Sequence, residues 1–416
     1  MATTVVCRQP WIPPSGLIPA HLAHGVSWVL LWQLARRQMF SASMPAFAWI
    51  HLVALGWLSL IALSVLLFVA PQFTGAAWIG ERWARLGLGM FAVGTYALVV
   101  AFWTSGTTWL WLAAALVVVG LGVYVVAAIM TLGGVLSSTG TDAAIARAFV
   151  VIFLFLLVAA ILGIVMARSL VSGEVSMLAT TARAHASLAA IGWLTLLVMG
   201  VSTRTLGPIT GQRSPRRWVH ILASGLVTLG ALVLGVAPWT GNALEWIGTL
   251  ACVVGLVIYA LDVLFLALAA TVPHRPPQAF VVASIGWLFI TCLLAVAVLR
   301  GNTNAAPACV FVGLIGWIGQ MVIAHLHHIG IRLIATMTRG DDDETLPEAL
   351  LSARLSWSSL ALFQVAVACG VLGLLTSRAD IVIVAAFSGG LGWFAMTANI
   401  IRAVSAANAP AQQTAL

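Results

Sequence analysis

The chain has 416 residues, of which 62% are apolar and only 7% are charged, whereas charged residues make up roughly 25% of an average soluble protein. This composition excludes a soluble globular domain. The formal net charge is +8, but the 19 basic residues are all arginines in short loops rather than in one patch, which excludes a nucleic-acid-binding surface. The five cysteines have no paired spacing and predict neither a disulfide framework nor a CxxC metal site.

Apolar runs of about 20 residues, long enough to cross a hydrocarbon layer of roughly 30 Å as helices, recur along the whole chain. Twelve helices are predicted, near residues 17–34, 46–70, 84–103, 108–132, 146–167, 184–203, 218–237, 244–270, 279–299, 308–331, 353–375 and 381–401. The first is the weakest because His21 and His24 interrupt it, and it either spans the membrane or lies at its interface. The predicted fold class is an all-α polytopic membrane protein, with the lipid bilayer as its main partner.

The arginines predict the orientation of these helices, because cytoplasmic loops carry an excess of basic residues. When each arginine is assigned to its nearest loop or terminus, thirteen fall on one side and six on the other. The larger group is Arg8, Arg82, Arg85, Arg147, Arg204, Arg213, Arg216, Arg217, Arg275, Arg332, Arg339, Arg354 and Arg402; the smaller is Arg36, Arg37, Arg168, Arg183, Arg300 and Arg378. We therefore expect a multi-pass protein of the bacterial inner membrane with both termini in the cytoplasm.

An internal repeat is visible in three of the predicted helices. They share a Gly-Trp core at Gly56-Trp57, Gly192-Trp193 and Gly316-Trp317, with spacings of 192 − 56 = 136 and 316 − 192 = 124 residues. Close helix packing accounts for any single pair, but it does not require a spacing of about four helices. The spacing predicts one transmembrane domain made of three four-helix pseudo-repeats, about residues 1–140, 141–277 and 278–416.

Ionisable side chains inside a membrane are costly, so the histidines are the first functional candidates. His51 lies five residues before Gly56 and His185 lies seven residues before Gly192, a difference in depth of about 3 Å at 1.5 Å per residue. Imidazole binds iron, copper and zinc. The pair is therefore expected to hold one metal, or the two faces of one planar cofactor; the alternative is a pair of interfacial histidines bonded to water or backbone.

Two further groups are candidates at other positions. His325, His327 and His328 lie late in the predicted helix 308–331 and form either a separate metal site or a set of interfacial histidines. Asp262 is a carboxylate within the predicted helix 244–270. Such a group can line a wet cavity and take part in proton or ion passage, or it can pair with an arginine.

Two segments of the chain carry a resemblance to a known family. Residues 51–57 (HLVALGW) are followed by 71–75 (PQFTG), and residues 185–193 (HASLAAIGW) run into 203–211 (TRTLGPITG). With twelve helices, these motifs resemble the haem-copper oxidase subunit I superfamily, and the second resembles its divergent NnrS branch, which is linked to the nitric oxide response. The resemblance implies haem b, with or without copper, held by His51 and His185.

The chain also departs from this family. Related branches have a second histidine where this chain has Ser187, and a terminal oxidase has an H-x-H motif where this chain has Cys309-Val310-Phe311. If the protein is an enzyme, the resemblance implies a haem-dependent oxidoreductase, but not a proton-pumping terminal oxidase. The expected role is electron transfer, with a redox partner protein, or the nitric oxide response. The alternatives are a small-solute or metal transporter and an assembly subunit without cofactor.

Overall fold

The computed structural model describes residues 12–40, 43–75, 77–136, 139–174, 176–212, 215–272, 275–334 and 350–408. These residues form twelve continuous helices and no strand, as the apolar runs predicted. Three of the helices change character along their length and carry several labels. In chain order the elements are α1 (Ile12–Arg37), α2 (Met44–His51), η1 (Leu52–Ser59), α3 (Leu60–Thr74), α4 (Glu81–Thr104), α5 (Thr107–Leu136), α6 (Thr141–Ser172), α7 (Leu178–Ser187), η2 (Leu188–Thr195), α8 (Leu196–Thr210), α9 (Arg217–Thr240), α10 (Asn242–Leu268), α11 (Pro276–Leu299), α12 (Ala305–Phe311), η3 (Val312–Gly319), α13 (Gln320–His325), η4 (Leu326–Gly330), α16 (Ala353–Leu375) and α17 (Ala379–Asn408).

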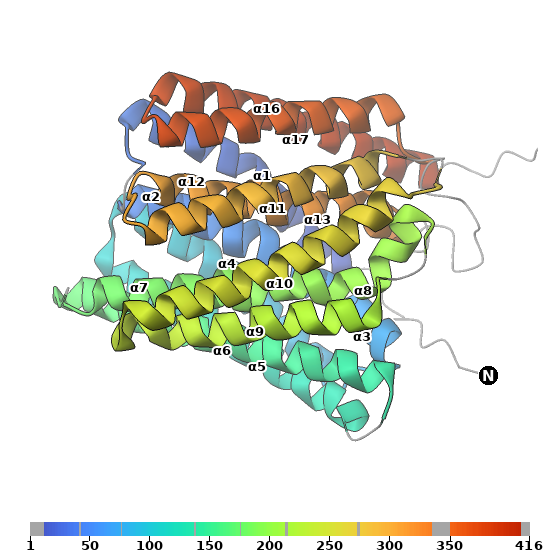
Figure 1. Cartoon of the computed structure of the whole chain (residues 1–416), viewed down its shortest axis with the longest axis horizontal. Coiled ribbons are helices and arrows are strands. Elements are labelled where there is room, and N and C mark those ends of the chain that lie inside the picture. The colour runs from blue at the N-terminus through green and yellow to red at the C-terminus, as the bar shows by residue number, and fades with distance from the viewer. Residues whose placement is uncertain are drawn as a thin grey trace, which may run out of the picture.

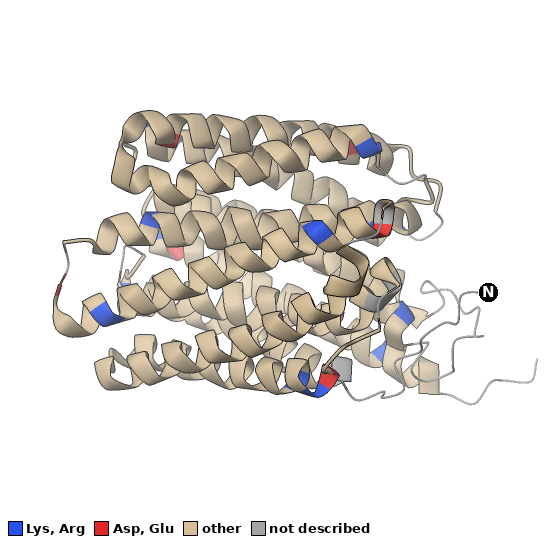
Figure 2. Ribbon diagram, turned by 90° about the horizontal axis from the view of Figure 1, so that it is seen from below, with Lys and Arg blue, Asp and Glu red and all other residues tan. Residues whose placement is uncertain are grey.

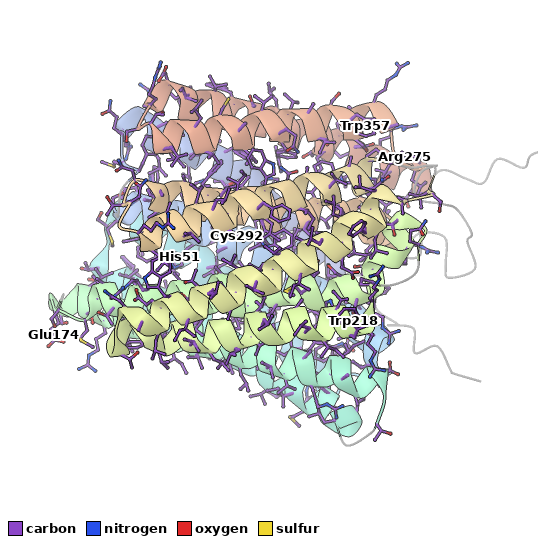
Figure 3. All side chains as sticks on the ribbon, in the orientation of Figure 1. His51, Glu174, Trp218, Arg275, Cys292 and Trp357 are labelled. Carbon is purple, nitrogen blue, oxygen red and sulfur yellow. The ribbon has the colours of Figure 1, made fainter. Side chains whose placement is uncertain are left out.

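The helices run side by side along one axis and form a bundle (Figure 1). One end of the bundle carries the starts of α2, α7 and α12 and is called the histidine end, because His51 lies there (Figure 3). The other end is called the terminal end, because α1 starts and α17 finishes there. Arg275, Trp218 and Trp357 lie toward the terminal end.

Within the described residues, eleven of the twelve helices are long and apolar enough to cross a membrane. Their outward faces carry large apolar side chains such as Val93, Trp109, Phe265 and Leu293, each more than 60% exposed. Most charged residues lie toward the two ends of the bundle (Figure 2). An apolar belt between charged ends is the surface that a bilayer requires, and the chain is a multi-pass membrane protein.

The twelfth helix, α1, is less apolar than the others but belongs to the same bundle. It has 26 residues, about 39 Å at 1.5 Å per residue, and it packs along α2, η1 and α3 on one side and along α17 on the other. Trp28 and Leu31 are buried there, while Leu22 and Val29 are more than half exposed. The helix therefore runs along the bundle rather than across its end.

Three central helices contain a π-helical segment of eight residues each. The segments are η1 (LVALGWLS), η2 (LAAIGWLT) and η3 (VGLIGWIG), and each has its Gly-Trp pair at the fifth and sixth positions. The helices that contain them are the three most buried of the eleven spans. A π-helix lengthens the hydrogen-bonded turn by one residue and is frequently found at functional sites. In η1 the Ser59 hydroxyl donates to the Ala54 carbonyl five residues earlier, at 2.7 Å.

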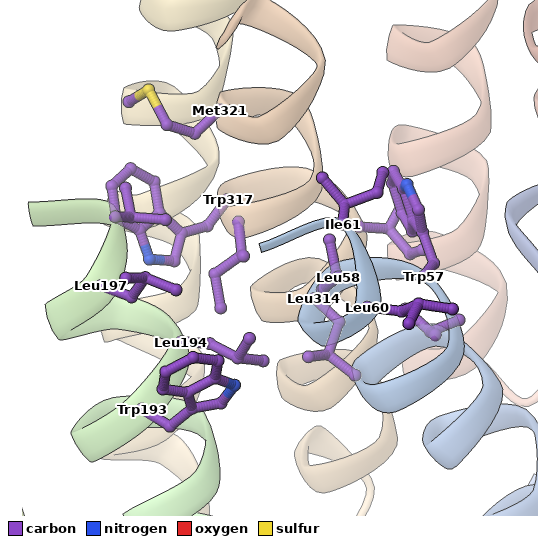
Figure 4. Packing of buried hydrophobic residues seen from close by; sticks show 14 of the residues in the cluster. Trp57, Leu58, Leu60, Ile61, Trp193, Leu194, Leu197, Leu314, Trp317 and Met321 are labelled. Carbon is purple, nitrogen blue, oxygen red and sulfur yellow. The ribbon is translucent and has the colours of Figure 1, made fainter. Parts of the chain in front are cut away.

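The tryptophans of these segments form contacts between the central helices. Trp57, Trp193 and Trp317 are all fully buried (Figure 4). The Trp193 indole N–H donates to the Ser59 hydroxyl of η1 at 2.9 Å. At the same position of η3 stands Gly319, where a Cβ atom would meet the Trp57 ring at 2.9 Å. In both contacts, the indole of one π segment packs against the last residue of another π segment. The boundaries of the pseudo-repeats stay a prediction.

Candidate metal centre at the histidine end

His51 is the last residue of α2, directly before the π segment η1. Its side chain is half-buried, and its Nδ1 donates to the Phe47 carbonyl at 2.8 Å. The Phe102 ring of α4 lies beside it, with ring centroids 4.9 Å apart. Because the carbonyl only accepts, Nδ1 carries the hydrogen and Nε2 of the neutral ring keeps its lone pair.

His185 lies near the end of α7, three residues before η2. It is half-buried, and its Nδ1 donates to the Ala159 carbonyl of α6 at 2.8 Å. On the same helix, a Cβ atom at Gly163 would touch the imidazole carbon Cε1 at 3.4 Å. The backbone of α6 therefore both orients the ring and leaves room for it. As in His51, Nε2 is the nitrogen that remains for a ligand.

The structure brings these two predicted residues together. The His51 and His185 ring centroids are 6.2 Å apart, with an angle of 26° between the ring planes. Two imidazoles bound to one metal through nitrogen bonds of about 2.0–2.1 Å have ring centres roughly 5–6.5 Å apart. Backbone carbonyls on the far nitrogens are the usual way to fix the tautomer of a metal-binding histidine. The separation of the two ring centres falls within this range.

The third π helix carries no histidine at the corresponding positions. Five residues before the glycine, the three helices have His51, Ser187 and Phe311; seven residues before it they have Trp49, His185 and Cys309. The rings of Trp49 and Phe311 stack on each other at 5.8 Å, and the Cys309 thiol donates to the Thr291 carbonyl at 3.7 Å. Among the three π helices, only the α2 and α7 positions therefore place two imidazoles next to each other.

The structure does not bring His325, His327 and His328 together as one ligand set. His325 donates from Nδ1 to the Met321 carbonyl at 2.7 Å, and its Nε2 lies 2.7 Å from the Thr205 hydroxyl of α8. His327 instead packs on the Phe280 ring of α11 at 5.3 Å. No group of three His, Cys, Asp or Glu side chains within the described ranges is arranged to hold a metal. A metal role for these histidines stays a prediction.

Asp262 lies nearer the end of its helix than the sequence suggested. It is 20 residues into α10, about 30 Å along it at 1.5 Å per residue. Its Oδ2 accepts a hydrogen bond from the Arg216 backbone N–H at 3.2 Å, directly before α9 begins. The carboxylate thus satisfies a backbone donor at the start of a neighbouring helix. This hydrogen bond accounts for a carboxylate at this position of α10, and no role in ion or proton passage is needed to explain it.

One histidine was not selected from the sequence. His24 of α1 is completely buried, and neither of its ring nitrogens has a hydrogen-bond partner within the described part of the chain. In the sequence it weakened the first predicted helix, and it was placed with His21 and His220 in the cytoplasmic half of the bundle without being selected as a site residue. The signal that would have found it is an imidazole inside an apolar run, at a depth where the other helices have leucine.

Comparison with the models of known protein families finds no match for this chain, and comparison with curated proteins finds none either. Fold and site therefore define the protein as a multi-pass α-helical membrane protein with a two-histidine candidate centre.

Proposed function

We propose that the protein is an integral membrane haem-binding protein in which His51 and His185 hold the iron of haem b. The observation that supports this function is the pair of neighbouring imidazoles, with ring centroids 6.2 Å apart, each with its Nδ1 hydrogen donated to a backbone carbonyl. Histidine is the commonest axial ligand of haem iron. The resemblance of the 51–57 and 185–193 motifs to the NnrS branch of the haem-copper oxidase superfamily supports the same cofactor.

The residues around the pair suit a cofactor with an apolar body. Phe102 packs beside His51, and Gly163 offers a bare backbone beside His185. Haem supplies one-electron exchange and the binding of diatomic gases when it is bound. The task of the protein would be to orient two neutral imidazoles and to surround them with apolar side chains. Copper can bind the same two nitrogens. A measurement of the iron and copper content therefore distinguishes a haem centre from a copper centre.

The proposed role is electron transfer or the nitric oxide response. The described residues place no third His, Cys, Asp or Glu with the two histidines as a further metal ligand, so the site does not offer the ligands of a haem-copper oxygen-reduction centre. We therefore propose a protein that exchanges electrons with a redox partner or binds nitric oxide, not a proton-pumping terminal oxidase. Its proposed location is the bacterial inner membrane.

The test is an absorption spectrum of the purified protein in detergent, oxidised and then reduced with dithionite, with iron and copper measured on the same sample. We expect a haem Soret band and reduced α and β bands, which His51→Ala and His185→Ala each remove. His220→Ala is the matched control, because this histidine is also on a membrane-spanning helix but bonds to Ser224. Full protein recovery with neither haem nor metal would overturn the proposal. Copper without haem would show that the cofactor of the centre is copper and not haem.

Addition of nitric oxide to the reduced protein separates the two roles. If the protein binds nitric oxide, the Soret band shifts in the wild type and in His220→Ala. If it only transfers electrons through a haem with two histidine ligands, the band stays unchanged because both axial positions are occupied.

A further inference from the structure

His24 lies at the middle of the bundle among other polar atoms that lack partners. Its ring stacks on the Trp57 indole, with centroids 3.6 Å apart and planes within 3°. The Trp28 ring is 5.9 Å away. Thr95 of α4 approaches Gly56, the residue before Trp57, with its methyl group 3.7 Å from the position of a Cβ atom there.

Five buried polar atoms of this cluster have no hydrogen-bond partner within the described ranges. They are Nδ1 and Nε2 of His24, Nε1 of Trp28, Nε1 of Trp57 and the hydroxyl of Thr95. Burial of a donor or acceptor without a partner is costly, and native proteins satisfy such groups with side chains, backbone or bound water. Five such atoms on His24 and on residues packed against it or against Gly56 indicate bound water, because water can donate to the free ring nitrogen and accept from the N–H groups.

Packing does not require a histidine at this position. The glycines of the three Gly-Trp pairs contact Ala23, Phe155 and Trp287 on the helices α1, α6 and α11. The residues that follow these three are His24, Leu156 and Leu288, and all are buried. Two of the three helices therefore fill the place with leucine. An ionisable group that replaces an apolar one inside a membrane indicates a function.

The helices around His24 contribute few groups that carry charge. Its own helix supplies His21, three residues before it. η1 supplies Trp57 and α16 supplies Phe363, whose rings stack on the imidazole. α4 supplies Thr95 beside Gly56, and its Tyr96 donates to the Pro19 carbonyl. Trp57, Phe363 and Thr95 are not ionisable in this range. His21 is one turn nearer the terminal end, where its Nε2 lies 2.7 Å from the Thr397 hydroxyl of α17.

We propose that His24 is the proton-binding residue of a hydrated site inside the bundle, which is reached from the terminal end past His21. We further infer that it takes up a proton when the centre at His51 and His185 is reduced, a step that rests on the proposed function. Trp57 is six residues after His51, about 9 Å along the helix. A positive charge on His24 therefore lies close enough to stabilise an added electron.

The first experiment does not depend on any cofactor. Exchange of the histidine ring C2 hydrogen for deuterium, followed by mass spectrometry on the full-length protein in detergent, reports on water access and protonation at each histidine. We expect His24 to exchange, with a sigmoidal dependence of the rate on pH, and Thr95→Val to slow its exchange. No exchange at His24 while His21 and His220 exchange would show a dry core position and overturn the proposal.

The second experiment measures the midpoint potential of the centre as a function of pH. One proton taken up per electron gives a slope of about 59 mV for each tenfold change in proton concentration. We expect this slope in the wild type and its loss in His24→Leu. Leucine is the residue at the corresponding place of α6 and α11, so this variant should retain the cofactor content of the wild type. An equal slope in both proteins would overturn proton uptake by His24. If the protein binds no metal, both the proposed function and the reduction-linked proton uptake by His24 fail. The hydrogen exchange experiment still decides whether the site around His24 is hydrated.

Discussion

The two histidines of the candidate centre are oriented by different parts of the chain. His51 donates to a carbonyl of its own helix, at Phe47, whereas His185 donates across to Ala159 of α6. A helix-internal bond of this kind follows from sequence spacing alone. The cross-helix bond does not, because it depends on how closely α6 approaches α7. Gly163 permits that approach.

Gly163 gives a graded test of this arrangement. A methyl group there would lie 3.4 Å from the His185 ring, an ordinary van der Waals contact, so Gly163→Ala should keep the cofactor content of the wild type. The longer side chain of Gly163→Leu should displace the imidazole and lower the ratio of haem to protein. The measurement is the Soret absorbance per mole of purified protein. Equal ratios in Gly163→Leu and wild type would contradict the role assigned to His185.

Asp262 provides a second prediction at the residue scale. Loss of a side-chain acceptor at the start of a helix costs about 0.5–2 kcal/mol, so Asp262→Ala should lower the apparent unfolding temperature. Asp262→Asn keeps an oxygen acceptor for the Arg216 N–H and should be close to wild type. Both variants should keep the spectrum of the wild type. A variant of normal stability that loses ion or proton passage would instead assign Asp262 to transport.

Much of the candidate pair was predictable from the sequence, and the reason is the repeat. The offsets of His51 and His185 from their Gly-Trp pairs gave similar depths on equivalent helices. The isolation of His325 from His327 was partly predictable, because residues two apart on a helix point in different directions. The importance of His24 was not predictable, since hydropathy shows only that it weakens an apolar run.

At the scale of elements, the sequence predicts the helices but not their π segments. An α-helix and a π-helix bury the same apolar residues, and eight residues such as LVALGWLS contain no polar periodicity that would distinguish the two. The recurrence of Gly-Trp at the same place in η1, η2 and η3 is the signal that sequence analysis did use. Gly-Trp alone is not a marker, because it also occurs at Gly286-Trp287 and Gly392-Trp393. The regular spacing of the three pairs identifies the helices that the structure shows to be the most buried.

Glycines set the distance between α4 and α5, and neighbouring positions of α5 allow a matched test. A Cβ atom at Gly120 would meet the Phe91 backbone nitrogen at 2.5 Å, whereas one at Gly122 would meet nothing within 4 Å. Gly120→Ala should force the helices apart at a cost of about 1–3 kcal/mol, and Gly122→Ala should be neutral or stabilise by up to about 1 kcal/mol. Thermal unfolding in detergent measures both. Similar stability for the two variants would show that the helices do not pack this closely.

At the scale of the whole molecule, α1 shows what hydropathy misses. Two histidines in its middle and two arginines at its end lower its apolar character, so composition alone left its place open. Its position follows from contacts with α17 and with the second helix, which are tertiary and cannot be read from a local run of residues. The histidines that lower the hydropathy of α1, His21 and His24, therefore lie within the bundle.

The orientation of the molecule in the membrane is the last prediction. The arginines of the described chain lie mostly at the terminal end, which includes Arg82, Arg85, Arg216 and Arg217, whereas Arg8, Arg213 and Arg339 of the same predicted group lie outside the described residues. We therefore expect the terminal end in the cytoplasm. The histidine end then faces the periplasm, and any redox partner of the His51 and His185 centre approaches from there.

Reporter fusions measure this orientation. Alkaline phosphatase needs disulfides, which form outside the cytoplasm, so a fusion after Gln38, between α1 and α2, should be active. A fusion after Asn408 should be inactive, while a fluorescent protein at that position should fluoresce. The opposite pattern would place the candidate centre near the cytoplasm and move the entry of electrons to that side. Phosphatase activity at both positions would place both on the same side of the membrane, and at least one of the eleven predicted spans between them would then not cross it.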